Sequence, residues 1–358
     1  MKILIDIGHP AHVHYYRNLI SLMKGEGNKF IIIARDRDVI FNLLDAYNIE
    51  YVSRGKGKDS IIGKVFYFFY AIFIIFKYSL INKVDVIISH GGIYTSIIGF
   101  LIRRHSITTE DTEHAKWSHR ISKPFTTYYI TPKSFYKNLG KKHLRIEALM
   151  EWFYLNPAYF VSDIGIKQKL GITNSEEYVI IRFVSWSAHH DVGQKGLSID
   201  KKREIIDMLK DKYRIFISSE SHLPQEFVQY KLPISPEEIH DVLSGATLFI
   251  SESGTMASEA SLLGTKTIYV NSLPLMCYLK LEQDYGLLKH FKNEEGLTNY
   301  LMNILDDKGL KDKAIRQRNI MVKPFIEPNR FFNWLLKDIS RNGKILKENP
   351  IYQERFKL

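Results

Sequence analysis

Short apolar runs alternate with longer amphipathic stretches along the first 150 residues of the chain. The apolar runs are rich in β-branched residues, as buried strands are, and they cover residues 2–7, 30–34, 50–52, 84–89, 107–109 and 128–131. Between them, apolar positions recur at helical spacing over residues 14–24, 39–47 and 94–103. This alternation predicts βαβ units that build a parallel sheet.

The same rhythm begins again in the second half of the chain. Strands are expected over residues 178–183, 214–218, 248–251 and 267–270, and helices over residues 201–209, 236–243 and 256–263. Proline disfavours helix at the preceding residue, so Asn156-Pro157 is the expected hinge. The pattern predicts an α/β protein with two Rossmann-like domains, residues 1–155 and 156–328, and an amphipathic helix near 329–345 that can cross back to the first.

One apolar stretch, residues 65–76, has no charge and is flanked by Lys64 and Lys77. A span needs about 20 apolar residues, and a span here would put the strands expected before and after it on opposite sides of the bilayer. The first expectation is therefore a crossover helix lying mostly in the core. The alternative is a helix with one face on lipid, because the stretch is aromatic-rich and has basic ends.

Charge is distributed unevenly between the two expected domains. The chain has 50 Lys and Arg against 39 Asp and Glu, a formal net charge of +11; the first 155 residues hold 22 against 13, net +9, and the remainder 28 against 26, net +2. This asymmetry favours one anionic partner of the first domain, such as an anionic membrane or a phosphorylated acceptor, and no nucleic acid. With one cysteine and no signal peptide, the protein is expected in the cytoplasm, where it could also lie at the inner face of the cell membrane.

The turn after the strand at 248–251 is the clearest candidate binding site. Ser253, Gly254, Thr255 and Met256 open a helix, where free N–H groups and the helix dipole suit a diphosphate-sized anion. Glu259 lies one helical turn beyond Thr255, where its carboxylate can accept bonds from two ribose hydroxyls. The alternative is an N-capped helix with a solvated glutamate.

Arg182 ends the strand at 178–183, so its guanidinium can clamp phosphate oxygens. The alternative is a strand-end arginine paired with a carboxylate. His189, His190 and Asp191 follow, but adjacent histidines of an extended chain point in opposite directions. No metal site is predicted.

Histidines and carboxylates gather in two loops of the first domain. His9, His12 and His14 join the first strand to the first helix, and an imidazole can take a proton from a hydroxyl near neutral pH. His12 is the best placed for this. Asp111 and Glu113 follow a later strand, with a capped helix start as the alternative explanation.

Nearly the whole chain resembles a family of uncharacterised archaeal and bacterial proteins, a domain of unknown function. The matching runs are residues 10–14, 111–115, 182–186, 188–193 and 255–260. That family is grouped with the GT-B fold of nucleotide-sugar glycosyltransferases and UDP-N-acetylglucosamine 2-epimerase, which implies two Rossmann-like domains facing a cleft. By resemblance, Ser253 to Thr255 hold the nucleotide diphosphate and Glu259 binds the ribose.

The first domain resembles two enzymes of that fold in different residues. Ala11-His12-Val13 is similar to the Gly-His-Val of the peptidoglycan transferase that acts on a lipid-linked acceptor, which places His12 by the acceptor. Asp111 and Glu113 could stand in for the acidic residues of the epimerase. The chain departs from the transferase by having Gly8-His9-Pro10 in place of a glycine-rich loop.

We expect a metal-independent glycosyltransferase that uses a nucleoside-diphosphate sugar, UDP-linked, in surface polysaccharide or glycolipid biosynthesis. His12, with Asp111 or Glu113, would deprotonate a lipid-linked or glycan acceptor, and Arg182 would stabilise the leaving diphosphate. No cofactor is expected, and the membrane contact is peripheral. The alternatives are an isomerase like the 2-epimerase and a non-catalytic nucleotide-sugar-binding protein.

Overall fold

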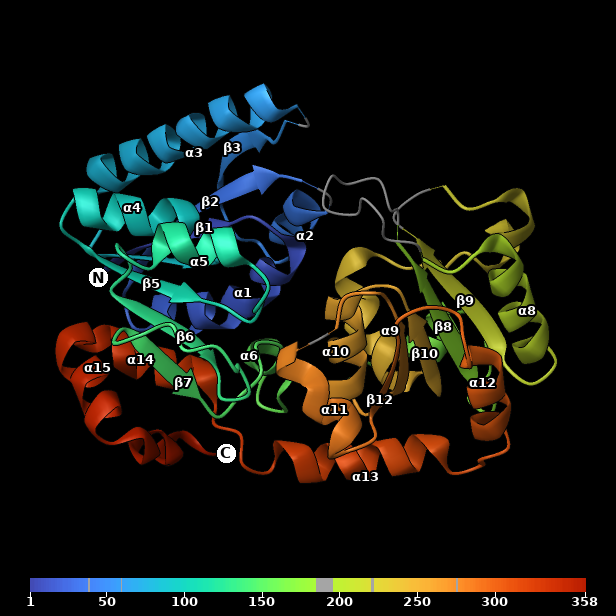
Figure 1. The fold of residues 1–358 in the computed structure, drawn as a ribbon. Helices are drawn as coiled ribbons and strands as arrows, with labels where there is room; N and C mark the ends of the chain where they lie inside the picture. Colours follow the sequence, from blue (N-terminus) through green and yellow to red (C-terminus); the bar gives the residue numbers. More distant parts are fainter. Residues whose placement is uncertain (38, 59, 185–195, 220–221, 275) are drawn as a thin grey trace. The chain divides into compact units, whose positions relative to one another are not determined.

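The computed structural model describes residues 1–358 except 38, 59, 185–195, 220–221 and 275. It divides into two compact units: unit 1 is Met1–Tyr159 with Pro324–Leu358, and unit 2 is Phe160–Lys323. Each unit holds one parallel sheet with helices around it, so the α/β class with two Rossmann-like domains is confirmed (Figure 1). His189, His190 and Asp191 lie outside the described residues.

Unit 1 contains a seven-stranded parallel sheet in the order β3-β2-β1-β4-β5-β6-β7. Its strands are β1 (Lys2–Ile7), β2 (Lys29–Asp36), β3 (Val52–Lys56), β4 (Val86–His90), β5 (His105–Thr109), β6 (Tyr128–Pro132) and β7 (His143–Ile146). Its first helices are α1 (Pro10–Gly25), α2 (Ile40–Ala46), α3 (Ile61–Asn82), α4 (Ile93–Leu101), α5 (Lys116–Ser122) and α6 (Trp152–Leu155). The strand expected at 50–52 instead begins at Val52, and β7 was not predicted.

The order of the strands fixes where a ligand can bind in unit 1. From β1 the chain moves outward through β2 and β3, and then returns to place β4 on the other side of β1. The connections after β1 and β4 therefore leave the sheet in opposite directions. Parallel α/β sheets bind ligands at such a switch point, beyond the carboxyl ends of the strands.

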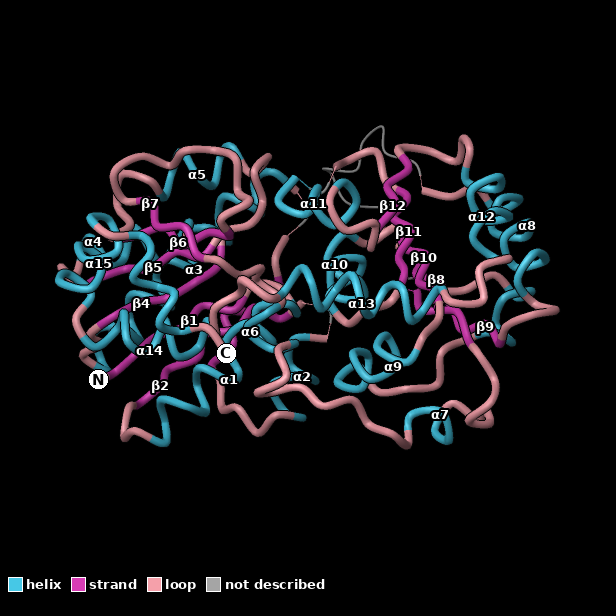
Figure 2. The backbone as a smooth tube through the Cα atoms, turned by 90° about the horizontal axis from the view of Figure 1, so that it is seen from below, coloured by secondary structure: helices cyan, strands magenta, loops and turns pink. Residues whose placement is uncertain are grey.

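The chain's last helices, α14 (Pro328–Lys337), α15 (Ile339–Glu348) and the 3₁₀ helix η5 (Pro350–Phe356), belong to unit 1 (Figures 1 and 2). Glu26 at the end of α1 accepts a hydrogen bond from Asn333 Nδ2 (2.6 Å) and an ion pair from Lys337 (3.1 Å). Phe331 and Phe332 are fully buried. This tail is therefore part of the core of unit 1.

The apolar helix differs from its first expectation. It extends over α3, Ile61–Asn82, and only Ala71, Ile75 and Ser79 are buried. By length and composition alone, α3 could cross a membrane. The prediction of a mostly buried crossover helix is wrong, because one narrow face packs on the sheet and on α4 while the wider apolar face is exposed.

Unit 2 contains a five-stranded parallel sheet in the order β12-β11-β10-β8-β9, with its switch point between β8 and β10. Its strands are β8 (Tyr178–Phe183), β9 (Arg214–Ser219), β10 (Leu248–Ser251), β11 (Lys266–Val270) and β12 (Leu288–Phe291). Its helices are α7 (Ile166–Lys169), α8 (Ile199–Leu209), η2 (Gln225–Tyr230), η3 (Pro236–Glu238), α9 (Ile239–Gly245), α10 (Gly254–Leu262), η4 (Met276–Tyr278), α11 (Leu279–Gln283), α12 (Leu297–Leu305) and α13 (Leu310–Val322). A capping box at Ser235 begins η3, and α9 follows it directly, so the helix expected at 236–243 is a 3₁₀ turn that leads into an α-helix.

Candidate functional site

In unit 1, the first turn of α1, the end of β4 and the loop after β5 bring two histidines and an aspartate together. The rings of His12 and His90 lie with centroids 4.9 Å apart. His90 Nε2 is 3.2 Å from Asp111 Oδ1, and Tyr15 Oη donates to Asp111 Oδ2 over 3.3 Å. The structure thus joins the predicted His12 and Asp111 through His90, which sequence reasoning had not chosen as a site residue.

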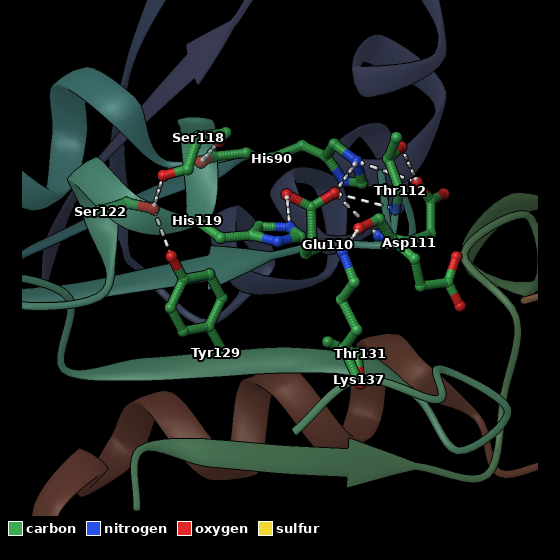
Figure 3. A network of polar contacts seen from close by, with 12 residues as sticks. His90, Glu110, Asp111, Thr112, Ser118, His119, Ser122, Tyr129, Thr131 and Lys137 are labelled. Atoms are coloured by element: carbon green, nitrogen blue, oxygen red, sulfur yellow. Dashed lines mark hydrogen bonds and ion pairs between the residues drawn. The ribbon is translucent and has the colours of Figure 1, made fainter. Parts of the chain in front are cut away.

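Glu110 is the buried centre of this cluster (Figure 3). Its Oε1 accepts the main-chain N–H groups of Asp111 (3.1 Å) and Thr112 (2.9 Å), and His90 Nε2 lies 3.8 Å away. On its other side, His119 Nε2 is 3.2 Å from Oε2. The two main-chain hydrogen bonds hold Oε1 in place, whereas Oε2 has, among the described residues, only the ion-pair contact with His119.

The three histidines of the first loop have different roles. His9 Nδ1 accepts the N–H of Ala11 over 3.2 Å and so caps α1. His14 is buried and stacks on Tyr154 at 5.2 Å between centroids. Within this loop, His12 is therefore the histidine packed against His90, and its candidacy as the base stays a prediction.

Glu113 lies two residues after Asp111 in the same loop. Its side chain is buried, and its main-chain carbonyl accepts a hydrogen bond from Lys137 Nζ. The candidates Asp111 and Glu113 thus differ in their surroundings: Asp111 is partly exposed and bonded to Tyr15, whereas Glu113 is enclosed.

Burial and neighbouring charges shift the pKa values of the two histidines in opposite directions. Burial, helped by His90 and His9, lowers the pKa of His12 well below its usual 6.5. Burial would also lower the pKa of His90, but Asp111 and Glu110 outweigh it and raise that pKa above 6.5. Near neutral pH the cluster therefore pairs a neutral imidazole with a more readily protonated one.

The proton of neutral His12 can be placed from its hydrogen bond. The main-chain N–H of Gly8 donates to His12 Nδ1 over 3.3 Å, so Nδ1 is the unprotonated nitrogen and Nε2 carries the hydrogen. This distance between the two nitrogens is slightly longer than in a usual hydrogen bond donated by N–H. The hydroxyl of the sugar-accepting substrate could therefore replace the Gly8 N–H as the hydrogen-bond donor to Nδ1.

Two glycines follow His90 directly at the end of β4. Gly91 and Gly92 have φ values of 77° and 66°, in the left-handed region that glycine favours. A Cβ on Gly92 would lie 2.3 Å from Thr108 Oγ1. The sequence signal was therefore present: a histidine at a strand end, directly before two glycines.

A buried ion pair supports the loop after β1. Arg54 Nε lies 2.7 Å from Asp6 Oδ1, and Arg54 also donates to the hydroxyl of Tyr67 on α3. A Cβ on Gly8 would lie 3.2 Å from Arg54, so a small residue is favoured there. The sequence did not reveal the pair, because its two partners are 48 positions apart on separate strands.

His90, Glu110 and Asp111 could hold a metal ion, since ligand atoms from all three lie within 4.8 Å of one another. A metal would displace bonds that these oxygens already make to main-chain N–H groups and to the hydroxyl of Thr112. Protonated His90 can supply the balancing positive charge instead. Metal-independent chemistry stays a prediction.

In unit 2, the predicted anion turn begins α10. Ser253 N–H donates to Ser251 Oγ (2.9 Å), and the Ser253 side chain makes no capping bond to the helix. Gly254 is the first helical residue, and Thr255 and Met256 are half-buried. The alternative of a side-chain-capped helix is therefore wrong. As at any helix start, the first N–H groups of α10 have no acceptor within the helix itself.

Glu259 is buried inside unit 2 rather than solvated. Only 4% of it is exposed, and Oε1 lies 3.1 Å from Nε2 of His240 on α9. The alternative of a solvated glutamate is therefore wrong. His240 orients the carboxylate from the first turn of α9, a partner 19 positions away that sequence reasoning missed.

Arg182 lies at the switch point of unit 2, in register with Ser251 on β10 and with Ser218 on β9. Its Nη1 donates to Ser218 Oγ over 2.7 Å, and its carbonyl accepts the N–H of Glu252. The guanidinium is thus directed toward β9, one strand from the anion turn. Its role as a phosphate clamp stays a prediction.

Glu252, directly after β10, is a second buried carboxylate that sequence reasoning missed. Its Oε2 accepts the N–H of Val184 over 2.8 Å, and Oε1 accepts the N–H of Leu197 over 2.6 Å. One side chain therefore anchors the chain just after β8 and just before α8. We assign Glu252 a structural role beside the anion turn.

Comparison with known proteins agrees with this architecture. A sequence model of the family described as "Protein of unknown function (DUF354)" matches residues 1–328. A relative from Methanocaldococcus jannaschii, "Uncharacterized protein MJ0665", is 25% identical over 318 residues, which cover 84% of this chain and 91% of that protein.

Solved structures of two enzyme classes share the fold. UDP-GlcNAc 2-epimerase from Neisseria meningitidis bound to UDP-GlcNAc superposes with a TM-score of 0.61 at 12% identity, covering 98% of this chain and 100% of that one. The Methanocaldococcus jannaschii 2-epimerase in complex with UDP-GlcNAc and UDP gives 0.61 at 14% identity, covering 90% and 99%. Spinosyn rhamnosyltransferase SpnG complexed with thymidine diphosphate gives 0.62 at 11% identity, covering 94% and 100%. At these identities the likeness shows the fold alone.

Proposed function

The chain belongs to the DUF354 family of unknown function, and we propose that it is a metal-independent glycosyltransferase that uses a nucleoside-diphosphate sugar, UDP-linked. The observation that carries this proposal is the chemistry at the two switch points. In unit 1 a neutral imidazole lies beside a histidine–carboxylate pair, and in unit 2 a helix N-terminus opens next to a strand-end arginine. The first suits proton transfer and the second suits an anion.

The donor diphosphate would bind at the start of α10. The N–H groups of Gly254, Thr255 and Met256 and the dipole of the helix would stabilise its negative charge, most strongly as the bond to the sugar breaks. The carboxylate of Glu259, oriented by His240, would accept bonds from the ribose hydroxyls. Arg182 would leave Ser218 and reach the diphosphate.

The acceptor hydroxyl would be activated in unit 1. Its oxygen attacks C1 of the donor sugar, the bond from C1 to the diphosphate oxygen breaks, and the electron pair leaves with the nucleotide. The hydroxyl proton passes to His12, which is neutral because its pKa is lowered. The carboxylate of Asp111 would stabilise the imidazolium that forms on His12, and that proton would pass to solvent after the products leave.

The difference in net charge between the two units indicates which kind of acceptor unit 1 would bind. Unit 1 contains 29 Lys and Arg against 17 Asp and Glu, net +12, and unit 2 contains 21 against 22, net −1. All of the positive surplus is therefore on unit 1. An anionic, lipid-linked or glycan acceptor of surface polysaccharide or glycolipid biosynthesis, met on the cytoplasmic side of the membrane, suits that surplus.

A 2-epimerase-like isomerase is the second candidate, and a specific observation favours it. Glu110, Asp111 and His90 form a set of neighbouring acid and base groups, which could remove and return a proton on a sugar carbon. Transfer ranks first because an anionic acceptor would be a substrate for the basic surface of unit 1 to bind, and an isomerase has no acceptor. Simple nucleotide-sugar binding ranks third, since it would not need the proton-transfer groups.

The test is to incubate the purified protein with a panel of UDP- and dTDP-sugars, with and without lipid-linked and glycan acceptors. Nucleotide release that requires an acceptor supports the transferase. A new epimer formed without acceptor, measured by NMR, overturns it in favour of the isomerase. If a nucleotide sugar raises the melting temperature but no nucleotide sugar is turned over, the protein is a non-catalytic nucleotide-sugar-binding protein.

A further inference from the structure

The exposed face of α3 forms a continuous apolar stripe in unit 1. Ile62, Phe66, Phe69, Phe73 and Leu80 recur at intervals of three, four and seven residues, which places them along one side of the helix. Their exposed fractions run from 51% to 72%. The buried residues of α3 lie on the opposite side.

This stripe stands out among the exposed apolar side chains. Nine of the large hydrophobic residues exposed in the described chain belong to α3 alone, whereas six are spread over the whole of unit 2. Single exposed apolar residues are ordinary, but a contiguous patch marks a surface that binds something.

The sheet rules out one way of covering this helix. Strand β3 precedes α3 and β4 follows it, and both belong to the same parallel sheet of unit 1. If α3 crossed a bilayer, these strands would lie on opposite sides of the membrane and could not share that sheet. A membrane can therefore meet α3 only along its length.

The charge around α3 indicates which kind of surface it meets. Between residues 60 and 84 there is no Asp or Glu, while Lys64, Lys77 and Lys83 are exposed. Lysine beside an apolar face is typical of helices that lie in the interface of anionic membranes. A protein partner would need no such one-sided charge, and unit 1 as a whole is strongly basic.

We infer that α3 is an in-plane membrane anchor, with its apolar stripe at the boundary of headgroups and acyl chains and its lysines on anionic headgroups. The inference goes beyond the proposed function, because it holds for a transferase or an isomerase. Under the transferase proposal it also places the acceptor on a membrane lipid.

Vesicle co-sedimentation tests this anchor. The protein should bind phosphatidylglycerol vesicles at low salt and bind phosphatidylcholine vesicles less. The triple variant F66Q/F69Q/F73Q should lose at least about 100-fold in partition coefficient, since each phenylalanine loses part of its apolar burial in the interface. The three side chains are exposed, so the melting temperature and the nucleotide-induced shift should be unchanged.

A matched control is the unit 2 variant I164Q/M302Q/I320Q, which removes three other exposed apolar side chains. It should bind vesicles as the native protein does. The inference is overturned if the native protein ignores anionic vesicles, or if both triple variants bind equally. It is also overturned if α3 instead joins two copies, seen as a concentration-dependent dimer that F66Q/F69Q/F73Q abolishes without vesicles.

Orientation can be tested with depth-dependent quenching of a fluorophore on Cys introduced at Ile62, Phe73 or Leu80, one at a time. The native Cys277 is buried and should remain unlabelled. An in-plane helix places all three labels at the same shallow depth. A label at Phe73 much deeper than those at Ile62 and Leu80 would show a span and overturn the inference.

Discussion

The two units place polar groups at the same point of their sheets but build them from different material. Unit 1 uses titratable side chains: His12, His90 and Asp111 contact one another beyond the ends of β1, β4 and β5. Unit 2 uses main-chain N–H groups at the start of α10, and its carboxylates, Glu252 and Glu259, already have buried partners. One site can change its charge near neutral pH, and the other keeps a fixed field.

This difference separates two tasks that a group-transfer enzyme must perform. Binding a diphosphate needs donors that stay in place whatever the pH, which main-chain dipoles provide. Moving a proton needs groups whose pKa values lie apart, as those of His12 and His90 do. Variants of unit 1 should therefore impair turnover, and variants of unit 2 should impair nucleotide binding.

The largest effect is expected from D111N in unit 1. Turnover should fall at least about 100-fold, because the amide cannot stabilise an imidazolium on His90 or His12. The nucleotide-induced rise in melting temperature should be unchanged. The exposed Asp45 offers a matched control, D45N, with native kinetics; equal losses in both variants would contradict the role of Asp111.

In unit 2, E259Q should weaken nucleotide affinity about 10- to 100-fold, since a charge-assisted bond to the ribose becomes a neutral one. H240Q should weaken it less, because it keeps the carboxylate and loses only the group 3.1 Å away that orients it. Isothermal titration with UDP measures both. If H240Q binds as tightly as the native chain while E259Q does not, His240 has no positioning role.

The fold followed from the sequence more readily than the sites did. Alternating apolar and amphipathic stretches predicted two parallel sheets, because periodicity records which face of each element is buried. The edge strands β7 and β12 were missed, because polar residues interrupt their sequences, HLRI and LKHF, and leave no apolar run. The prediction that residues 65–76 are mostly buried was wrong, because an apolar helix has the same sequence pattern whether protein or something else covers it.

Site residues could be predicted where chemistry is local in the chain. The anion turn, His12 and Asp111 stand directly after strands, so sequence order alone placed them at sheet ends. Partners such as His240 and Arg54 could not be predicted, because their contacts join positions far apart. A single sequence records what each residue offers and not which distant residue it meets.

The pH dependence should differ between the units. Turnover should fall on the acid side below 6.5, where His12 begins to take up a proton despite its lowered pKa, and on the alkaline side above 6.5, where His90 loses its proton. Loss of the His90 charge leaves the carboxylates of Glu110 and Asp111 to repel an anionic acceptor. H90Q should lack the alkaline limb, and nucleotide binding by unit 2 should stay flat; a native alkaline limb in H90Q would exclude His90 as its cause.

The smallest effect is expected from removing metal ions. If protonated His90 balances Glu110 and Asp111, EDTA followed by gel filtration should leave turnover unchanged, and added Mg²⁺, Mn²⁺ or Zn²⁺ should not raise it. A transferase of this kind relies on the α10 dipole in place of a cation at the diphosphate. The opposite result would be a loss of activity with EDTA that one metal restores in the native protein and does not restore in H90Q. His90, Glu110 and Asp111 would then be a metal site rather than a proton relay, and both units would use fixed charge.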